Sequence, residues 1–250
     1  MRKIVLSLIL MLTFLVSCHN QTINHVEEIR NAISCANRAT VAIIQDRTES
    51  SDEAARPYCS GFFISRTMIV SALHCFQDVR TVRIGNAIYR VFLVPNPTGH
   101  VIQFVRYGEI NMLTLNFTNN TVNEARVIYS DLENDVALLS IEPGTEPSNV
   151  YLSLRQDAPS ITEHVYLFGH PDGIVWTVVD GIISRIINDE HGIPIAIQSS
   201  APLVGGFSGG PLINERGEVV GVARGYISNM HHISIFTSSN QVLNLAPIAN

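Results

Sequence analysis

Short runs of alternating apolar and polar residues recur along most of this chain, from about residue 40 to residue 236. Val82-Arg83-Ile84 and Met112–Phe117 are clear examples. A period of two is typical of β-strands with one buried face, and turn residues separate the runs. The predicted strands are Thr40–Gln45, Gly61–Ser65, Met68–Ser71, Val79–Ile84, Ala87–Val94, Val101–Tyr107, Met112–Phe117, Ala125–Tyr129, Val136–Ile141, His164–Phe168, Val175–Val179, Gly181–Ile187, Ile193–Gln198, Pro211–Ile213, Glu218–Ala223 and His232–Phe236.

Helical patterns occur only near the two ends of the chain. Residues 18–37 are mostly polar, and Val26–Ile33 within them predicts a short helix on a tether. Near the C-terminus, Ser238 or Ser239 caps a predicted helix at 238–247, whose apolar face is Val242, Leu243 and Leu245. Many short strands with so few helices predict an all-β barrel or sandwich. The stretch 142–159, rich in Pro, Ser and Asp, is the predicted linker between two halves.

Composition narrows the class of protein without identifying it. Hydrophobic residues make up 46% of the 250 residues and charged residues only 15%, which excludes a disordered chain. The net charge of -6, with no Lys/Arg cluster, argues against nucleic-acid binding. There is no internal repeat and no phosphate-binding glycine pattern, so no nucleotide cofactor is expected.

The N-terminus has the form of an export signal. Met1-Arg2-Lys3 is basic, and the apolar run at 4–16 would rise only about 20 Å as a helix, too short to span a bilayer. The run ends in Leu15-Val16-Ser17-Cys18, which resembles the lipobox of bacterial lipoproteins. That resemblance implies a signal peptide at 1–17, lipidation of Cys18 and attachment to the bilayer through lipid. With His19 next, it favours the outer membrane facing the periplasm. The alternative is an ordinary cleaved signal in which Cys18 has no role.

Three further cysteines follow, and an exported chain meets an oxidising compartment. One pair can form a disulfide. Cys59 and Cys75 would close a loop of about 17 residues, worth roughly 3 kcal/mol in the chain-entropy model. Cys35 would then be a free, buried thiol. No His/Cys spacing matches a zinc site, so we expect no metal.

Ser208 is the candidate nucleophile. It lies in Gly205-Gly206-Phe207-Ser208-Gly209-Gly210, and glycine at 206 would let the N–H groups of Gly206 and Ser208 point at one spot, as an oxyanion hole requires. The alternative is a glycine-rich turn between strands without a catalytic role.

A base and an orienting carboxylate also have candidates. His74 follows a predicted strand and adjoins Cys75, so a disulfide to Cys59 would hold this base in place, as general-base catalysis requires. Asp135 directly precedes the apolar run Val136–Leu139, where its carboxylate can be desolvated under the imidazole. Asp131 and Glu133 are close alternatives.

The segments Ser71–Cys75 (SALHC), Asn134–Leu139 (NDVALL) and Gly206–Leu212 (GFSGGPL), in this order, resemble the chymotrypsin/trypsin superfamily of serine proteases. Two further stretches, 167–184 and 215–222, resemble its HtrA-type bacterial branch. The resemblance spans about residues 40–245.

The resemblance implies two six-stranded antiparallel β-barrels of the chymotrypsin-like fold, with a short C-terminal helix. The peptidase domain would occupy 38–250, with lobe 1 at about 38–145 and lobe 2 at about 155–237. It further implies an endopeptidase acting on polypeptides through His74, Asp135 and Ser208, with the cleft between the lobes.

Two departures from the family pattern limit what carries over. Phe207 stands where trypsin-like enzymes have an Asp that pairs with a newly cut N-terminus, so we expect no zymogen cleavage. Only about a dozen residues follow the last predicted strand, so we expect no PDZ domain and no caging by oligomers, and a monomer is favoured.

Specificity is weakly determined by the sequence. Pro202 stands where trypsin-like enzymes have an acidic residue that binds the Lys or Arg side chain of the substrate. Its presence argues against a preference for basic residues at the cleavage site. Ala223 and Arg224 are candidates for the pocket wall, and a small or aliphatic preference is expected. Two other functions remain open: a catalytically silent lipoprotein that binds partners through the protease fold, and hydrolysis of a non-peptide ester.

Overall fold

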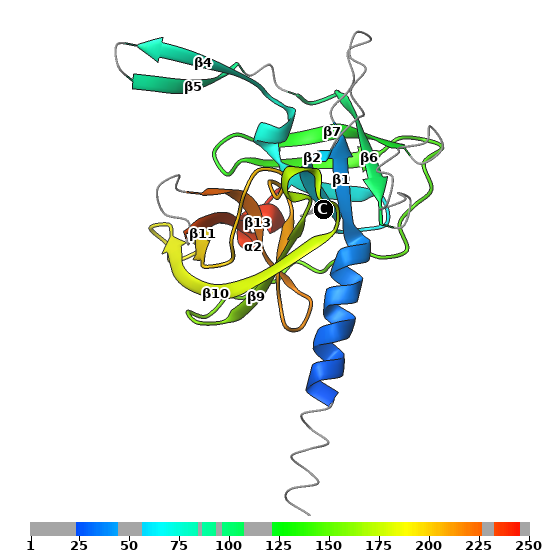
Figure 1. Ribbon diagram of the computed structural model, residues 1–250, viewed down its shortest axis with the longest axis vertical. Coiled ribbons are helices and arrows are strands. Elements are labelled where there is room, and N and C mark those ends of the chain that lie inside the picture. The colour runs from blue at the N-terminus through cyan, green and yellow to red at the C-terminus, as the bar shows by residue number, and fades with distance from the viewer. Residues whose placement is uncertain are drawn as a thin grey trace, which may run out of the picture.

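The computed structural model describes residues 24–44, 57–84, 87–93, 97–107, 122–226 and 233–245, which form two closed β-barrels (Figure 1). All strand pairs within them are antiparallel. The two-barrel, chymotrypsin-like fold expected from the sequence is therefore confirmed.

The first barrel closes in the order β1 (Thr40–Ile44), β2 (Pro57–Phe63), β3 (Met68–Ala72), β8 (Val136–Ile141), β7 (Asn123–Asp131) and β6 (Val101–Arg106). The second closes in the order β10 (Thr177–Asn188), β11 (Pro194–Ser199), β14 (Ser234–Ser238), β13 (Val219–Tyr226), β12 (Pro211–Asn214) and β9 (His164–Gly169).

Strand β8 shows why its sequence is a continuous apolar run and does not alternate. Ala137 and Leu139 point into the core of the first barrel. Val136 and Leu138 point the other way, into a cluster shared with the second barrel. Because both faces of β8 are covered, every position from 136 to 139 is apolar and fully buried.

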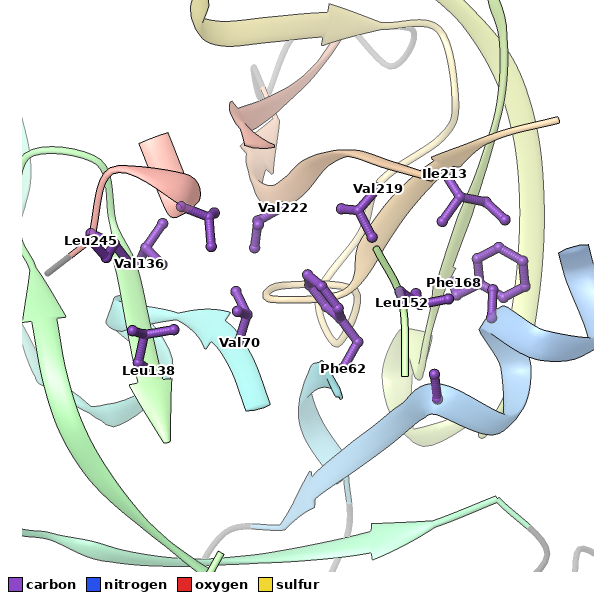
Figure 2. Packing of buried hydrophobic residues seen from close by; sticks show 13 residues of the cluster. Phe62, Val70, Val136, Leu138, Leu152, Phe168, Ile213, Val219, Val222 and Leu245 are labelled. Atoms are coloured by element: carbon purple, nitrogen blue, oxygen red, sulfur yellow. The ribbon is translucent and has the colours of Figure 1, made fainter. Parts of the chain in front are cut away.

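This shared cluster joins the two lobes (Figure 2). Phe62 and Val70 from the first barrel meet Val219 and Val222 of β13, and Leu245 packs beside Val136. Burying each side chain of this size stabilises the folded state by about 1.5–3 kcal/mol, so the cluster keeps the two lobes packed together.

The strand prediction differs from the structure in two places. The predicted strands at 175–179 and 181–187 are one continuous strand, β10, in which Gly181 pairs with Val165 without a break. A Cβ on Gly181 would lie 2.3 Å from the backbone N of Ala201, so this glycine serves close packing and does not end a strand. β4 (Asp78–Ile84) and β5 (Ala87–Leu93) form a separate hairpin outside both barrels (Figure 1). The predicted strand Met112–Phe117 lies outside the described residues.

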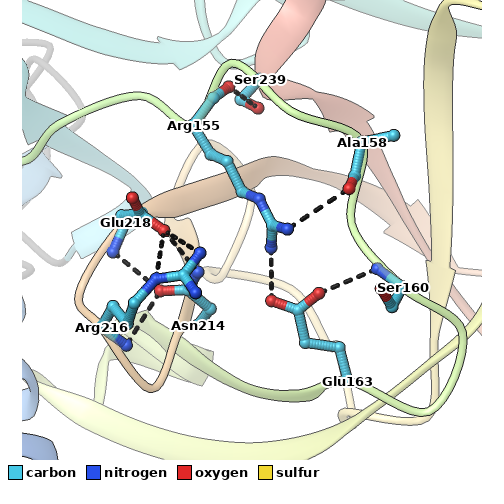
Figure 3. A network of polar contacts seen from close by, with 8 residues as sticks. All are labelled: Arg155, Ala158, Ser160, Glu163, Asn214, Arg216, Glu218 and Ser239. Atoms are coloured by element: carbon cyan, nitrogen blue, oxygen red, sulfur yellow. Dashed lines mark hydrogen bonds and ion pairs between the residues drawn. The ribbon is translucent and has the colours of Figure 1, made fainter.

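The interval predicted as a linker packs against both lobes. The N–H of Leu152 donates to the Phe63 carbonyl of the first barrel at 2.8 Å. Leu154 forms a bridge with Val219. Arg155 forms an ion pair with Glu163 at 2.5 Å, and its carbonyl accepts a hydrogen bond from Ser239 (Figure 3). Beside it, Glu218 binds both Arg216 and Asn214 across the β12–β13 turn, and these contacts lower its pKa.

Both terminal helices differ in length from the prediction. The N-terminal helix occupies residues 24–39 and leads directly into β1 (Figure 1). Its second half packs Ala36 and Ala39 into the shared cluster, and Cys35 is free but only partly buried. The C-terminal helix α2 is Ser239–Leu243, with Ser238 as its N-cap. Within the described residues, no helix combines the length and apolar character needed to cross a membrane.

Candidate active site

His74 is fixed by the short 3-10 helix η1 (Leu73–Phe76), which follows β3. The structure contains the disulfide between Cys75 and Cys59, and so ties η1 to β2. Next to it, the buried hydroxyl of Tyr58 donates a hydrogen bond of 2.8 Å to the carbonyl of Cys75. Burial raises the pKa of Tyr58 to about 12, so this donor keeps its proton. The backbone that carries the imidazole is therefore held on both sides.

Asp135 holds the ring of His74 from behind. Nδ1 of His74 lies 2.7 Å from Oδ2 of Asp135, and the His74 backbone N–H donates to Oδ1 at 2.9 Å. A carboxylate can only accept, so Nδ1 donates and Nε2 is left as the acceptor. Asp135 also adopts the left-handed conformation (φ 56), which a non-glycine residue keeps only where its surroundings enforce it.

The two alternative carboxylates make other contacts. Asp131 accepts hydrogen bonds from the backbone N–H and the side-chain amide of Asn134, which closes the turn before β8. Glu133 is exposed. Of the three acids near the start of β8, Asp135 is the one in contact with His74.

Ser208 lies in a turn of the second lobe that the first lobe anchors. The Ser60 hydroxyl, on β2, donates to the carbonyl of Gly206 at 2.7 Å, and the Ser60 N–H donates to the carbonyl of Ser208 at 2.8 Å. Gly206 has φ 95, and a Cβ there would lie 2.2 Å from the carbonyl oxygen of His170. Only glycine fits this position.

The same turn leaves two backbone donors without partners. Among the described residues, neither the N–H of Gly206 nor that of Ser208 has a hydrogen-bond acceptor. The carbonyls of the same two peptide units are bound: the Gly205 carbonyl accepts the N–H of Asp172 at 3.0 Å, and the Phe207 carbonyl accepts the N–H of Gly210 at 2.8 Å, which fixes both peptide orientations. Two free, adjacent N–H groups are suited to bind a developing negative charge on oxygen.

One cleft connects these groups. Its volume is about 910 Å³, and its walls include His74, Gly206 and Ser208 together with Tyr58 and Gln103. The Ser208 hydroxyl makes no hydrogen bond within the described residues, so the bond to Nε2 of His74 is not formed in this state. Such bonds often form only when substrate is bound.

His170 packs against the turn that carries Ser208, next to Gly206. Its structural role was not predicted from the sequence. Its side chain is fully buried, and Nδ1 accepts the backbone N–H of Trp176 at 3.0 Å. Burial lowers the pKa of His170 to about 3, against a smaller opposite effect from the backbone of Val41, so the ring is neutral. In the same loop, the N–H of Asp172 donates to the carbonyl of Gly205.

Two other features mark this loop. Asp172 and Trp176 both have positive φ, at 48 and 53, as expected for a strained segment at a functional site. The available sequence signal was the apolar end of the predicted strand His164–Phe168, two residues before His170, since a solvent-facing histidine is less expected next to such a run.

The three residues assigned to the specificity pocket have different surroundings. Pro202 is exposed. Ala223 is buried, and its backbone exchanges hydrogen bonds with the nucleophile turn at Gly209 and Gly210. The side chain of Arg224 extends toward the first lobe, where it meets Asp135 and the carbonyl of Glu133.

The remaining site predictions concern lipid and metal. Cys18 lies outside the described residues. Potential ligand atoms of Cys59, His74 and Cys75 lie within 4.8 Å of one another. Since both sulfurs are joined in the disulfide, no thiolate is available and this group cannot hold a metal in its oxidised form.

One protein family, several curated relatives and several solved structures match this chain. Residues 59–222 match the family model of the trypsin-like peptidase domain. A probable periplasmic serine endoprotease of the DegP-like type from Pseudomonas fluorescens is 39% identical over 102 residues, which are 40% of this chain and 21% of that protein. A probable serine protease do-like protein from Buchnera aphidicola is 31% identical over 116 residues, covering 45% and 24%. The chain thus spans about a quarter or less of the length of these curated relatives.

Solved structures show the same fold at low identity. The serine endoprotease from Yersinia pestis superposes with a TM-score of 0.60 at 21% identity, covering 89% of this chain and 67% of that one. The active form of the Rv3671c protease from M. tuberculosis gives 0.58 at 19% identity, covering 84% and 80%.

Proposed function

This chain belongs to the trypsin-like peptidase family, and we propose that it is a serine endopeptidase with His74 as general base, Asp135 as orienting carboxylate and Ser208 as nucleophile. The observation that supports this most is the 2.7 Å contact between His74 Nδ1 and Asp135 Oδ2, since it leaves Nε2 to accept a proton in the cleft that Ser208 also lines.

The proposed reaction follows from these positions. As the Ser208 hydroxyl attacks the scissile carbonyl, His74 takes its proton, and Asp135 stabilises the imidazolium that forms. The carbonyl oxygen becomes an oxyanion within reach of the N–H groups of Gly206 and Ser208. A single donor of this kind is worth roughly 3–4 kcal/mol in the transition state. His74 then gives the proton to the leaving amine, and water hydrolyses the acyl-enzyme by the reverse sequence.

After removal of the signal peptide, the proposed enzyme needs no zymogen cleavage to become active. Phe207 is buried in the core of the second barrel, against Gly169, and carries no charge to pair with a new N-terminus. The contacts that support the oxyanion turn are instead the Ser60 hydrogen bonds and the Asp172 N–H to the Gly205 carbonyl. All of them are present in the uncleaved chain.

We further propose a location in the bacterial envelope, tethered to the outer membrane through acylated Cys18, with polypeptides as substrates. The basis is the export signal with its lipobox-like end and the periplasmic names of the relatives. Cys18→Ser is expected to move the protein from the membrane fraction to the soluble fraction and to abolish labelling by radioactive palmitate. Unchanged partition between the fractions would refute the anchor.

A fluorophosphonate probe tests the enzyme assignment. It is expected to label the wild type at Ser208 and to fail on Ser208→Ala. The matched control is Ser153→Ala, which removes an exposed hydroxyl from the interval between the lobes and is expected to label fully. Labelling that survives Ser208→Ala would refute the nucleophile. No labelling of the folded wild type would instead favour the catalytically silent binding protein.

A further inference from the structure

The turn that carries Asp135 is held by two side chains of the opposite lobe. The guanidinium of Arg224 donates to the Glu133 carbonyl at 3.2 Å, and the Thr237 hydroxyl donates to the Asn134 carbonyl at 2.5 Å. The Nε of Arg224 lies 3.9 Å from Oδ2 of Asp135 itself. Three consecutive residues of the first lobe are therefore anchored from β13 and β14.

The backbone of β13 explains why Arg224 points this way. Ala223 pairs with Phe236 and Gly225 pairs with the next residue, Ile235, so Arg224 is the extra residue of a β-bulge. A bulge bends its strand and re-aims the side chain of the extra residue. Here it directs Arg224 across to the first lobe, whereas the sequence had suggested a place in the wall of the specificity pocket.

Arg224 and His74 meet at the same atom. Oδ2 of Asp135 lies 2.7 Å from His74 Nδ1 and 3.9 Å from Arg224 Nε. The carboxylate is only 15% exposed, and Arg224 is 40% exposed. Oδ2 of Asp135 therefore has a permanent cation from the second lobe beside it in addition to His74. Its left-handed backbone conformation also needs support from its surroundings.

We infer that Arg224 is a positioning residue that acts on His74 through Asp135, holding the carboxylate in place from the second lobe and moderating its charge. The inference concerns the catalytic apparatus and so rests on the proposed function. It replaces a role for Arg224 in reading the substrate side chain.

Two effects of Arg224→Ala follow. Loss of a partly exposed ion pair and its hydrogen bond is expected to lower kcat roughly two- to five-fold with KM unchanged, equally for substrates with acidic, aliphatic and basic residues before the cut. Loss of a positive charge near the Asp135–His74 pair makes protonation of His74 easier. The acid limb of the kcat/KM profile is then expected to move up by at least about half a pH unit.

Four other ionisable groups lie on the elements around the site. Tyr58 and His100 line the same cleft, Asp131 is bound to Asn134, and Asp172 lies beyond the nucleophile turn. None of them contacts Arg224 in the described residues, so the shift between wild type and variant isolates the arginine.

The test combines kinetics with an NMR titration of the His74 imidazole in Ser208→Ala protein, which does not depend on activity. Arg224→Ala should raise the half-titration pH of His74, Arg224→Lys should keep it near wild type, and Arg216→Ala, an exposed control in the same lobe, should leave it unchanged. An unmoved titration with an altered substrate preference would overturn the inference and return Arg224 to the specificity pocket. A moved titration together with no fluorophosphonate labelling of the folded wild type would sustain the action of Arg224 on His74 through Asp135 and refute the proposed function.

Discussion

The buried, neutral His170 makes the stability of this protein depend on pH in a way that can be calculated. Its pKa is about 3 in the folded state, because burial disfavours the charged ring, against about 6.5 in an unfolded chain. Between these values the unfolded state binds more protons than the folded state. Stability therefore falls as the pH is lowered from about 6.5 toward 3.

The size of the effect follows from the two values. Each pH unit well below 6.5 costs about 1.4 kcal/mol, so going from pH 7 to pH 5 is expected to cost about 2 kcal/mol through His170 alone. Any folded-state pKa of His170 below about 4 gives nearly the same loss of stability at pH 5. The prediction therefore depends on burial of the ring and not on the precise value of its folded-state pKa.

Urea unfolding followed by tryptophan fluorescence provides the assay. Trp176 is the only tryptophan in the sequence, and its ring lies 5.3 Å from that of His170, so it reports on this site directly. In His170→Gln, whose side chain does not titrate, the loss of unfolding free energy between pH 7 and pH 5 should be about 2 kcal/mol smaller than in wild type. In His191→Gln, at an exposed turn, it should equal the wild-type loss.

Because carboxylates and other histidines also titrate in this range, only the difference between the variants is diagnostic. An equal pH dependence in wild type and His170→Gln would show that the ring is solvated or already protonated when folded. That result would refute the account of the loop that supports the oxyanion turn.

Three further predictions concern the site itself. Asp135→Asn should leave the unfolding transition close to wild type but lower kcat by roughly 10⁴, since the amide favours the wrong tautomer of His74; full activity would refute its role. Gly206→Ala should lower kcat by at least about 10², because its Cβ would lie 2.2 Å from the His170 carbonyl oxygen. In the control Gly205→Ala the new Cβ would meet only Asp172 Oδ1 at 3.9 Å, so kcat should fall far less. Cys59→Ser/Cys75→Ser should lower the unfolding free energy by roughly 3 kcal/mol in a urea titration, while Cys35→Ser, at the cysteine that is already free, should change it by much less.

Local sequence patterns were sufficient to predict most of the strands and the three segments that carry the candidate catalytic residues. Alternation of apolar and polar residues located most strands, and the run at 136–139 marked a strand covered on both faces. The segments around His74, Asp135 and Ser208 were recognisable because each function restricts several neighbouring residues at once. Gly206, Gly209 and Gly210, for example, stand where a Cβ would collide with backbone.

Contacts between residues distant in sequence were decided only by the tertiary structure. The periodicity of a strand shows which of its faces is buried, but not which other element covers that face. It therefore could not place the β4–β5 hairpin outside the barrels. Nor could it predict that His170 is buried next to the turn that carries Ser208. The sequence favoured Asp135 over Asp131 and Glu133, but the contact that distinguishes it, with an imidazole some sixty residues away, is visible only in the tertiary structure. The direction of Arg224 likewise depends on one extra residue in the pairing of β13 with β14, a register that neither strand specifies alone.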